Sequence, residues 1–159
     1  MPRKPNHPWA TDAWIERTRV ILDSFERFVG RELLQRGSSL AETARLLYEA
    51  PFVVVAHGLE DDPILNYANQ TALTLWETEL ETLLKMASRQ TAEPVHRDER
   101  ARMLETTRQQ GYIDDYRGVR ISAVGKRFRI ERAIVWNLVD DAGLPAGQAA
   151  TFSEWTPLG

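Results

Sequence analysis

Charged side chains gather between residues 114 and 132, and they include the groups of this chain best suited to bind an anion. The cations are Arg117, Arg120, Lys126, Arg127, Arg129 and Arg132, and the acids are Asp114, Asp115 and Glu131. A guanidinium offers a planar fork of donors that matches a carboxylate or a phosphate. We therefore take Arg120 and Arg132 as candidates for binding an anionic ligand. The alternative is that these arginines pair with acids across neighbouring strands on the outer face of a sheet.

The same stretch offers weaker evidence for catalysis. Adjacent side chains of a strand point to opposite faces, so Asp114 and Asp115 are poorly placed to hold one proton together. A small α+β cone enzyme would instead need one of these acids beside Tyr116 or His57 in a deep polar pocket. We place this enzyme hypothesis behind a non-enzymatic function.

No set of residues predicts a bound metal or cofactor. His57 and His96 lack a second histidine or a carboxylate at ligand spacing. The chain has no cysteine, which excludes disulfides, thiolate metal sites and cysteine nucleophiles. We expect neither a metal nor a cofactor.

The composition is that of a globular protein, with 159 residues, 43% hydrophobic and 27% charged. The formal net charge of -3 argues against a protein that neutralises nucleic-acid phosphates. No apolar run approaches the roughly 20 residues of a membrane helix, and the start lacks the apolar core of a signal peptide. We expect a cytoplasmic protein that binds neither nucleic acid nor membrane.

The first third of the chain predicts a tail followed by two helices. Residues 1–10 are proline-rich and predict a flexible tail. Residues 11–50 predict a first helix that extends past Gly30 to Gly37, and a second helix that opens with the capping box of Ser39 and Glu42. The first helix carries an apolar stripe, whose interface candidates are Trp14, Ile21, Phe25 and Phe28. This stripe predicts either a cap on the chain's own sheet or the interface of a homodimer.

Residues 51–157 predict an α+β domain. Two short strand signals, residues 52–56 and 64–68, come first, and short helical patterns follow up to Gly111. Three longer strand signals then cover residues 112–123, 126–139 and 147–155. In the middle one, Phe128, Ile130, Ile134, Trp136 and Leu138 share one parity, which predicts a single core face. Arg132 breaks that parity, which indicates a bulge, an edge position or a charge that faces a pocket. The order of elements predicts an antiparallel sheet with helices across one face.

Several separated stretches of this block resemble one family. The phrase DPILNYANQTAL at residues 62–73 resembles the start of PAS domains, where a strand ends in Asn and runs into a short helix. More closely, the block resembles the MEKHLA domain, through YIDDYRGVRIS (112–122), GKRFRI (125–130), VWNL (135–138) and GQAATF (147–152). The resemblance covers about two-thirds of the chain and implies a PAS-like, five-stranded antiparallel sheet with helices on one face. It brings no catalytic motif, and the homeodomain and leucine zipper of the plant members have no counterpart here.

A PAS-like fold implies a pocket between the sheet and the short helices. The candidate lining residues are Tyr67, Trp76, Met103, Tyr116, Arg120, Ser122, Phe128, Arg132, Trp136, Gln148 and Phe152. Aromatic residues at strand or helix spacing are also ordinary core residues, so close packing is the alternative for each. Asn69 is best explained as a helix cap.

The resemblance favours a PAS-like sensory or ligand-binding domain that acts as a small regulatory protein. Its expected partners are a small organic ligand and a second copy of the chain. A ligand-free protein-interaction or dimerisation module is the second hypothesis, and the cone enzyme is the third.

Overall fold

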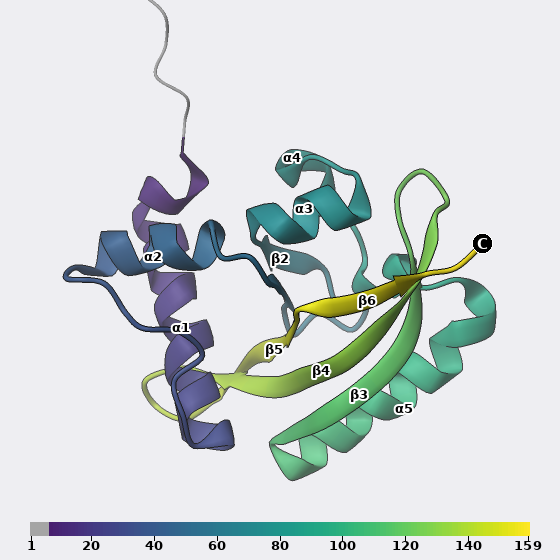
Figure 1. Cartoon of the computed structure of the whole chain (residues 1–159). Helices are drawn as coiled ribbons and strands as arrows, with labels where there is room; N and C mark the ends of the chain where they lie inside the picture. The colour runs from purple at the N-terminus through teal and green to yellow at the C-terminus, as the bar shows by residue number, and fades with distance from the viewer. Residues whose placement is uncertain (1–6) are drawn as a thin grey trace, which may run out of the picture.

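The last third of the chain forms three adjacent strands of an antiparallel sheet, from its centre to one edge. The computed structural model describes residues 7–159. Strands β3 (Tyr112–Ile121), β4 (Arg127–Val139) and β5 (Pro145–Phe152) pair as consecutive hairpins. The two short strands β1 (Val53–His57) and β2 (Leu65–Ala68) extend the sheet on the far side of β5, so the order is β2-β1-β5-β4-β3 (Figure 1). The predicted α+β architecture is thereby confirmed.

A sixth strand, β6 (Glu154–Pro157), replaces the end of the single strand predicted for residues 147–155. β5 pairs with residues 134–139 of β4, whereas β6 pairs with residues 128–131. The break between β5 and β6 lies opposite Arg132 of β4, whose φ of 50° takes the backbone out of the extended conformation. The two strands therefore share one position beside β4, which keeps the PAS-like order.

Two bulges in the β3–β4 hairpin reverse the face of the sheet to which alternate side chains point. Ile113 pairs with Val135, Tyr116 with Ala133 and Gly118 with Ile130, so the spacing on the two strands differs at Asp115 and at Arg132. Both of these residues have a positive φ, 54° and 50°. An inserted residue reverses the inward and outward alternation beyond it.

The prediction of one core face on β4 is consequently wrong beyond Arg132. Phe128, Ile130 and Ala133 pack in one apolar cluster with Trp76 and Phe152. Trp136 and Leu138 lie in a second cluster on the opposite face. The sheet buries side chains on both faces, and the bulge at Arg132 lets a single strand serve both clusters.

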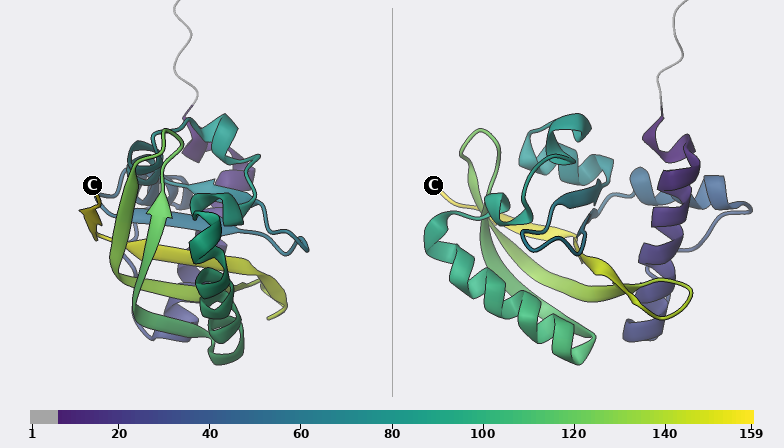
Figure 2. Two further views of the ribbon diagram at one scale, coloured as in Figure 1. Left: turned by 90° about the vertical axis from the view of Figure 1, so that its right-hand side faces the viewer. Right: turned by 180° about the vertical axis from the view of Figure 1, so that it is seen from behind.

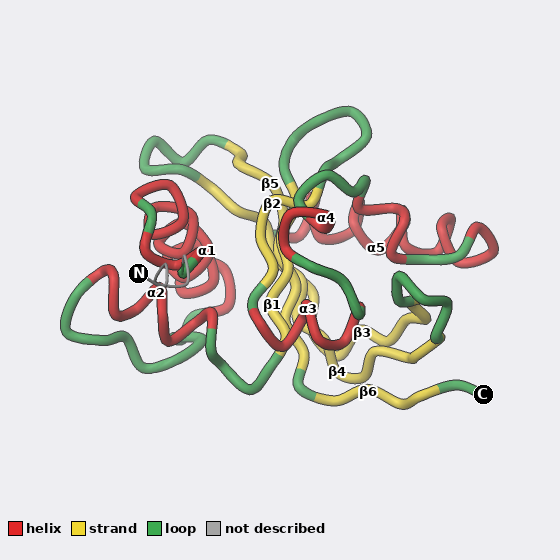
Figure 3. The backbone as a smooth tube through the Cα atoms, turned by 90° about the horizontal axis from the view of Figure 1, so that it is seen from above, coloured by secondary structure: helices red, strands yellow, loops and turns green. Residues whose placement is uncertain are grey.

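Helices cover the two faces separately. Helices α1 (Asp12–Val29) and α2 (Leu40–Tyr48) lie on one side, and α5 (Pro94–Gln110) lies on the other (Figures 1 and 3). The short helices α3 (Gln70–Trp76) and α4 (Leu80–Leu83) and the 3-10 helix η2 (Ser88–Thr91) connect β2 to α5, as Figure 2 shows from behind. α1 ends earlier than predicted, because Gly30 adopts the left-handed conformation of a C-cap with φ 87°.

Half of the capping box predicted at Ser39 forms, since its hydroxyl accepts from the backbone N–H of Glu42 at 3.0 Å. The Glu42 carboxylate accepts from the backbone N–H of Ser38 at 3.0 Å in place of that of Ser39. Of the predicted tail, residues 1–6 lie outside the described part of the chain, and Pro8–Ala10 form a short 3-10 helix, η1.

Helix α1 packs its apolar stripe on the chain's own sheet. Trp14, Ile21 and Phe25 are buried. The Phe25 ring meets the edge of Trp136 at 4.8 Å between centroids, and the Trp136 indole N–H donates to the Ile21 carbonyl at 3.2 Å. Phe28 is only half-buried. Three of the four interface candidates thus pack on the chain's own sheet and are not free to form an interface. Homodimerisation stays a prediction that these three side chains do not support.

Asn69 joins three elements at the entry to α3. Its Oδ1 accepts from the backbone N–H groups of Val54 at 3.1 Å and Ala72 at 3.2 Å. Its Nδ2 donates to the carbonyls of Leu47 at 3.1 Å and Phe52 at 2.8 Å. The side chain is therefore a helix cap, as predicted, and it also fixes the end of α2 and the start of β1 against α3.

The docking of α1 predicts different costs for two phenylalanines of the same helix. Phe25→Ala should lower the free energy of unfolding by about 3–5 kcal/mol, because it leaves a cavity against Trp136. Phe28→Ala, the matched control, should cost about 1 kcal/mol, since the ring is already half in solvent. Urea unfolding of both variants measures the difference. Equal and small costs would contradict the docking of α1 on this sheet.

Candidate ligand pocket

A cavity lies between the α5 side of the sheet and the segments that connect β2 to α5. The space open to the centre of a water molecule is about 60 Å³, and the walls are mostly apolar. The residues that contribute polar groups come from separate elements: His57 from β1, Trp76 from α3, Ser88 and Thr91 from η2, Arg100 from α5, Tyr116 and Arg120 from β3, and Gln148 from β5.

Arg100 brings a buried positive charge to this cavity. It is 8% exposed and donates a hydrogen bond to the hydroxyl of Ser88. Burial, together with the nearby charge of Arg120, lowers the pKa of Arg100 to about 10, so the group stays protonated at neutral pH. Among residues 7–159 no carboxylate lies within ion-pair distance of it.

Arg120 places a second guanidinium at the same cavity. It is 5% exposed, and its guanidinium donates to the Tyr116 hydroxyl at 3.2 Å and to the Val119 carbonyl at 2.9 Å. The Tyr116 hydroxyl in turn donates to Glu99 of α5 at 2.9 Å. Gly118 lies between Tyr116 and Arg120 on the strand, and a Cβ there would collide with the Tyr116 ring. The glycine therefore lets the ring lie along the strand and support the guanidinium.

Two residues that line the cavity each bury a polar atom without a hydrogen-bond partner in the described structure. The atoms are Nε1 of Trp76, a donor, and Nε2 of His57. The other ring nitrogen of His57, Nδ1, lies 3.1 Å from the carbonyl of Gly58. A carbonyl only accepts, so Nδ1 carries the proton and Nε2 of the neutral ring is an acceptor. Burial and the charge of Arg100 lower the pKa of His57, which favours this neutral form.

The structure brings about half of the predicted pocket residues together. Those that line the cavity are Trp76, Met103, Tyr116, Arg120, Gln148 and Phe152. Gln148 also joins β5 to its neighbours, because its amide donates to the Leu104 carbonyl of α5 at 2.9 Å and to Oδ1 of Asn137 at 3.1 Å.

The other predicted pocket residues lie elsewhere. Tyr67 and Trp136 pack on the α1 side of the sheet. Trp136 lies beyond the Arg132 bulge, after which Val135 faces the pocket. The register shift between β1 and β2 puts Tyr67 and the pocket residue Leu65 on opposite faces, although they are two residues apart. The Phe128 ring packs edge-to-face with the Trp76 ring, with 5.2 Å between their centroids, and does not line the cavity. Ser122 ends β3, where its hydroxyl donates to Glu77 at 3.2 Å. Arg132 sits on its bulge with a side chain 70% exposed, 3.9 Å from Glu154.

The ligand-pocket residues predicted from the sequence do not include Arg100 or His57, and His57 enters as a candidate only through the enzyme hypothesis. Arg100, Met103 and Thr107 are the buried residues of α5, and their spacing of three and four marks one helical face. That spacing could have indicated the buried face of α5, but the many charged residues of the helix hide the pattern in the sequence.

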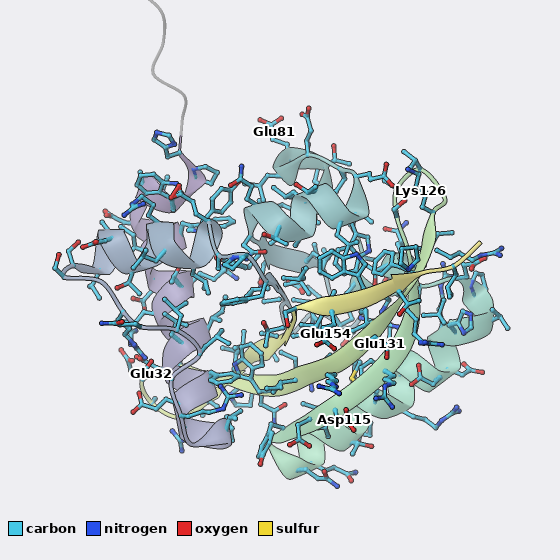
Figure 4. All side chains as sticks on the ribbon, in the orientation of Figure 1. Glu32, Glu81, Asp115, Lys126, Glu131 and Glu154 are labelled. Carbon is cyan, nitrogen blue, oxygen red and sulfur yellow. The ribbon has the colours of Figure 1, made fainter. Side chains whose placement is uncertain are left out.

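The remaining charges of the 114–132 stretch form pairs on the solvent side. Glu131, on the face of the sheet turned away from α5 (Figure 4), lies 2.9 Å from Arg117 and 2.6 Å from Arg129. Asp114 and Asp115 are exposed, apart from the pocket where Tyr116 and His57 lie. Most arginines of this stretch therefore pair with acids at the surface, which was one alternative. Arg120 is buried at the cavity, which was the other.

Comparison with known proteins agrees with this geometry. The sequence profile of the MEKHLA domain matches residues 15–157. The chain belongs to the MEKHLA domain family. The match begins within α1, so it covers most of α1, all of α2 and the sheet.

Relatives of this chain include plant homeobox-leucine zipper proteins. HOX29 of Oryza sativa subsp. indica is 28% identical over 144 residues, which cover 88% of this chain and 17% of that protein. ATHB-9 of Arabidopsis thaliana is 30% identical over 94 residues, 59% of this chain and 11% of that protein. The chain therefore spans less than a fifth of the length of these relatives.

Solved structures show the same fold. A PAS domain from Colwellia psychrerythraea superposes with a TM-score of 0.60 at 12% identity, covering 72% of this chain and 92% of that one. A light-oxygen-voltage domain studied with a flavin analogue gives 0.57 at 17% identity, covering 73% of this chain and 84% of that one. The MEKHLA chain therefore has a PAS fold.

The chain has no cysteine, so a flavin in this pocket could form no cysteinyl adduct. Within residues 7–159, no cluster of three His, Asp or Glu side chains could hold a metal ion, and no helix is long and apolar enough to cross a membrane.

Because Arg100 is buried without a carboxylate partner among the described residues, its replacement by an apolar residue should stabilise the protein. Arg100→Met should raise the free energy of unfolding by about 1 kcal/mol or more, because a buried charge is replaced by an apolar chain of similar length. Arg102→Met, at an exposed position of the same helix, is the control and should change stability by less than about 0.5 kcal/mol. Thermal and urea unfolding measure both variants. A marked loss of stability in Arg100→Met alone would contradict this electrostatic description.

Proposed function

We propose that this MEKHLA chain is a non-enzymatic, PAS-like sensory domain whose pocket binds a small organic acid through Arg100 and Arg120. The proposal rests on one observation above all: two buried guanidiniums line one apolar cavity, and neither has a carboxylate partner among the described residues. Retaining unpaired charge in a core costs stability, and such groups are typical of functional sites. A ligand carboxylate would neutralise both.

The chemistry of the walls supports a carboxylate with a short apolar body. The guanidinium donors and the Trp76 indole N–H can surround an anion. Val55, Leu65, Ile130 and Phe152 can contact a hydrocarbon portion. The space open to the centre of a water molecule is only about 60 Å³, which favours a small ligand.

Binding at this site would act on the position of α5. The buried residues of α5 are Arg100, Met103 and Thr107, which is a small apolar contribution for a helix of 17 residues. An anion held between Arg100 of α5 and Arg120 of β3 would add a bridge between helix and sheet. Ligand binding would therefore favour the docked helix over looser positions, and this shift in population is the proposed signal.

An enzymatic function has less support. The cone-enzyme hypothesis needs Asp114 or Asp115 beside Tyr116 or His57, whereas both acids are exposed. Tyr116 is held by Glu99 and Arg120, and burial raises the pKa of its hydroxyl, so it is a poor proton acceptor at neutral pH.

Propionate and propionamide test the proposed function, because the two molecules have the same shape and differ in charge. Propionate should bind with a dissociation constant in the micromolar to millimolar range, and propionamide should bind at least about tenfold more weakly, since the charge-assisted bonds to arginine are lost. Titration calorimetry on the full chain measures both affinities.

Two arginine variants locate the site in the same experiment. Arg120→Met should lose propionate binding, whereas Arg129→Met, on the solvent side of the hairpin, should retain it. Melting temperatures show that each variant is folded. Equal binding of acid and amide, or no binding of propionate, would overturn the proposal.

A further inference from the structure

The pocket contains an acceptor that a simple carboxylate cannot satisfy. Nε2 of His57 has no partner among the described residues, and the residue is 9% exposed. Nδ1 is committed to the Gly58 carbonyl at 3.1 Å, so the free nitrogen is the one without a proton. A buried acceptor that lacks a donor is a cost to folding unless a ligand or water supplies one.

The position of His57 relative to the arginines is fixed by backbone pairing. His57 ends β1, where it pairs with Gln148 of β5. Gly147, with φ 128°, lets β5 approach the His57 carbonyl closely, because a Cβ at this position would collide with it. His57, Arg100 and Arg120 thus reach one cavity from β1, α5 and β3. A ligand there meets cationic donors from two walls and a neutral acceptor from a third.

We propose that the pocket selects a small hydroxy acid, whose carboxylate pairs with Arg100 and Arg120 and whose hydroxyl donates to Nε2 of His57. This inference rests on the anion-binding function proposed above and adds a specificity-determining residue to it. A keto acid of the same size would present a second acceptor to Nε2 and gain nothing there. An acid without the hydroxyl would leave Nε2 unpaired.

Lactate, pyruvate and propionate separate these cases. All three carry one carboxylate on a three-carbon chain, and they differ at the second carbon alone. Titration calorimetry of the full chain at about pH 8, where imidazole is neutral, should give at least one lactate enantiomer an affinity about tenfold above that of propionate. Pyruvate should bind no more tightly than propionate.

Two variants of His57 assign the preference to its acceptor nitrogen. His57→Leu should reduce lactate affinity to that of propionate while propionate binding is retained. His57→Gln, which keeps an acceptor on a similar side chain, should recover part of the preference for lactate. His96→Leu, outside the pocket, should leave all affinities unchanged. Melting temperatures confirm that each variant is folded.

The outcomes distinguish this inference from the function on which it rests. If propionate, pyruvate and lactate bind equally, the hydroxy-acid inference is overturned and anion binding stands. A preference for lactate that survives in His57→Leu also overturns it. If none of the three acids binds, both the anion-binding function and the hydroxy-acid preference fail.

Discussion

The bulge at Arg132 is the constraint on which the rest of this molecule depends. A regular strand shows one set of side chains to each face along its whole length. β4 instead turns Phe128, Ile130 and Ala133 toward the pocket side, and Trp136 and Leu138 toward α1. Because of this change, one strand supports both the cavity and the helical cap. The accompanying bulge at Asp115 keeps β3 in register with it, so Tyr116 and Arg120 reach the cavity.

The two faces of the sheet have different physical characters. The α1 side is closely packed, with the Phe25 ring against Trp136 and the Trp14 ring against Tyr67. Two buried polar atoms on the α1 side, Nε1 of Trp14 and the hydroxyl of Tyr67, lack a partner among the described residues, as do Nε1 of Trp76 and Nε2 of His57 on the pocket side. The pocket side alone adds two buried guanidiniums without a carboxylate partner in the described part of the chain, beside open space. The densely packed face and the four hydrogen bonds of Asn69 provide stability that the pocket side lacks. Such an uneven distribution is expected where a site retains groups for binding at the expense of folding.

The sequence was sufficient for the order of elements and for the family, because helix caps and strand patterns are local. Ser39, Asn69 and Gly111 each act where local capping chemistry places them. The faces of β4 were not predictable in the same way, since a bulge is a property of two paired strands. Arg132 was recognised as a break in parity, yet its consequence for Trp136 depends on which helix covers each face. Arg100 was missed because α5 is charged on most of its surface, and only the tertiary structure shows which arginine it buries.

The central claim is that Arg100 and Arg120 together hold the anion. Nuclear magnetic resonance of the arginine side-chain Nε–Hε groups, in protein labelled with ¹⁵N-arginine, observes each guanidinium separately. On addition of lactate the signals of Arg100 and Arg120 should shift together and saturate at one concentration, while those of the surface arginines Arg117 and Arg129 stay in place. Unchanged Arg100 and Arg120 signals at saturating lactate, or equal shifts at the surface arginines, would contradict this account of the pocket.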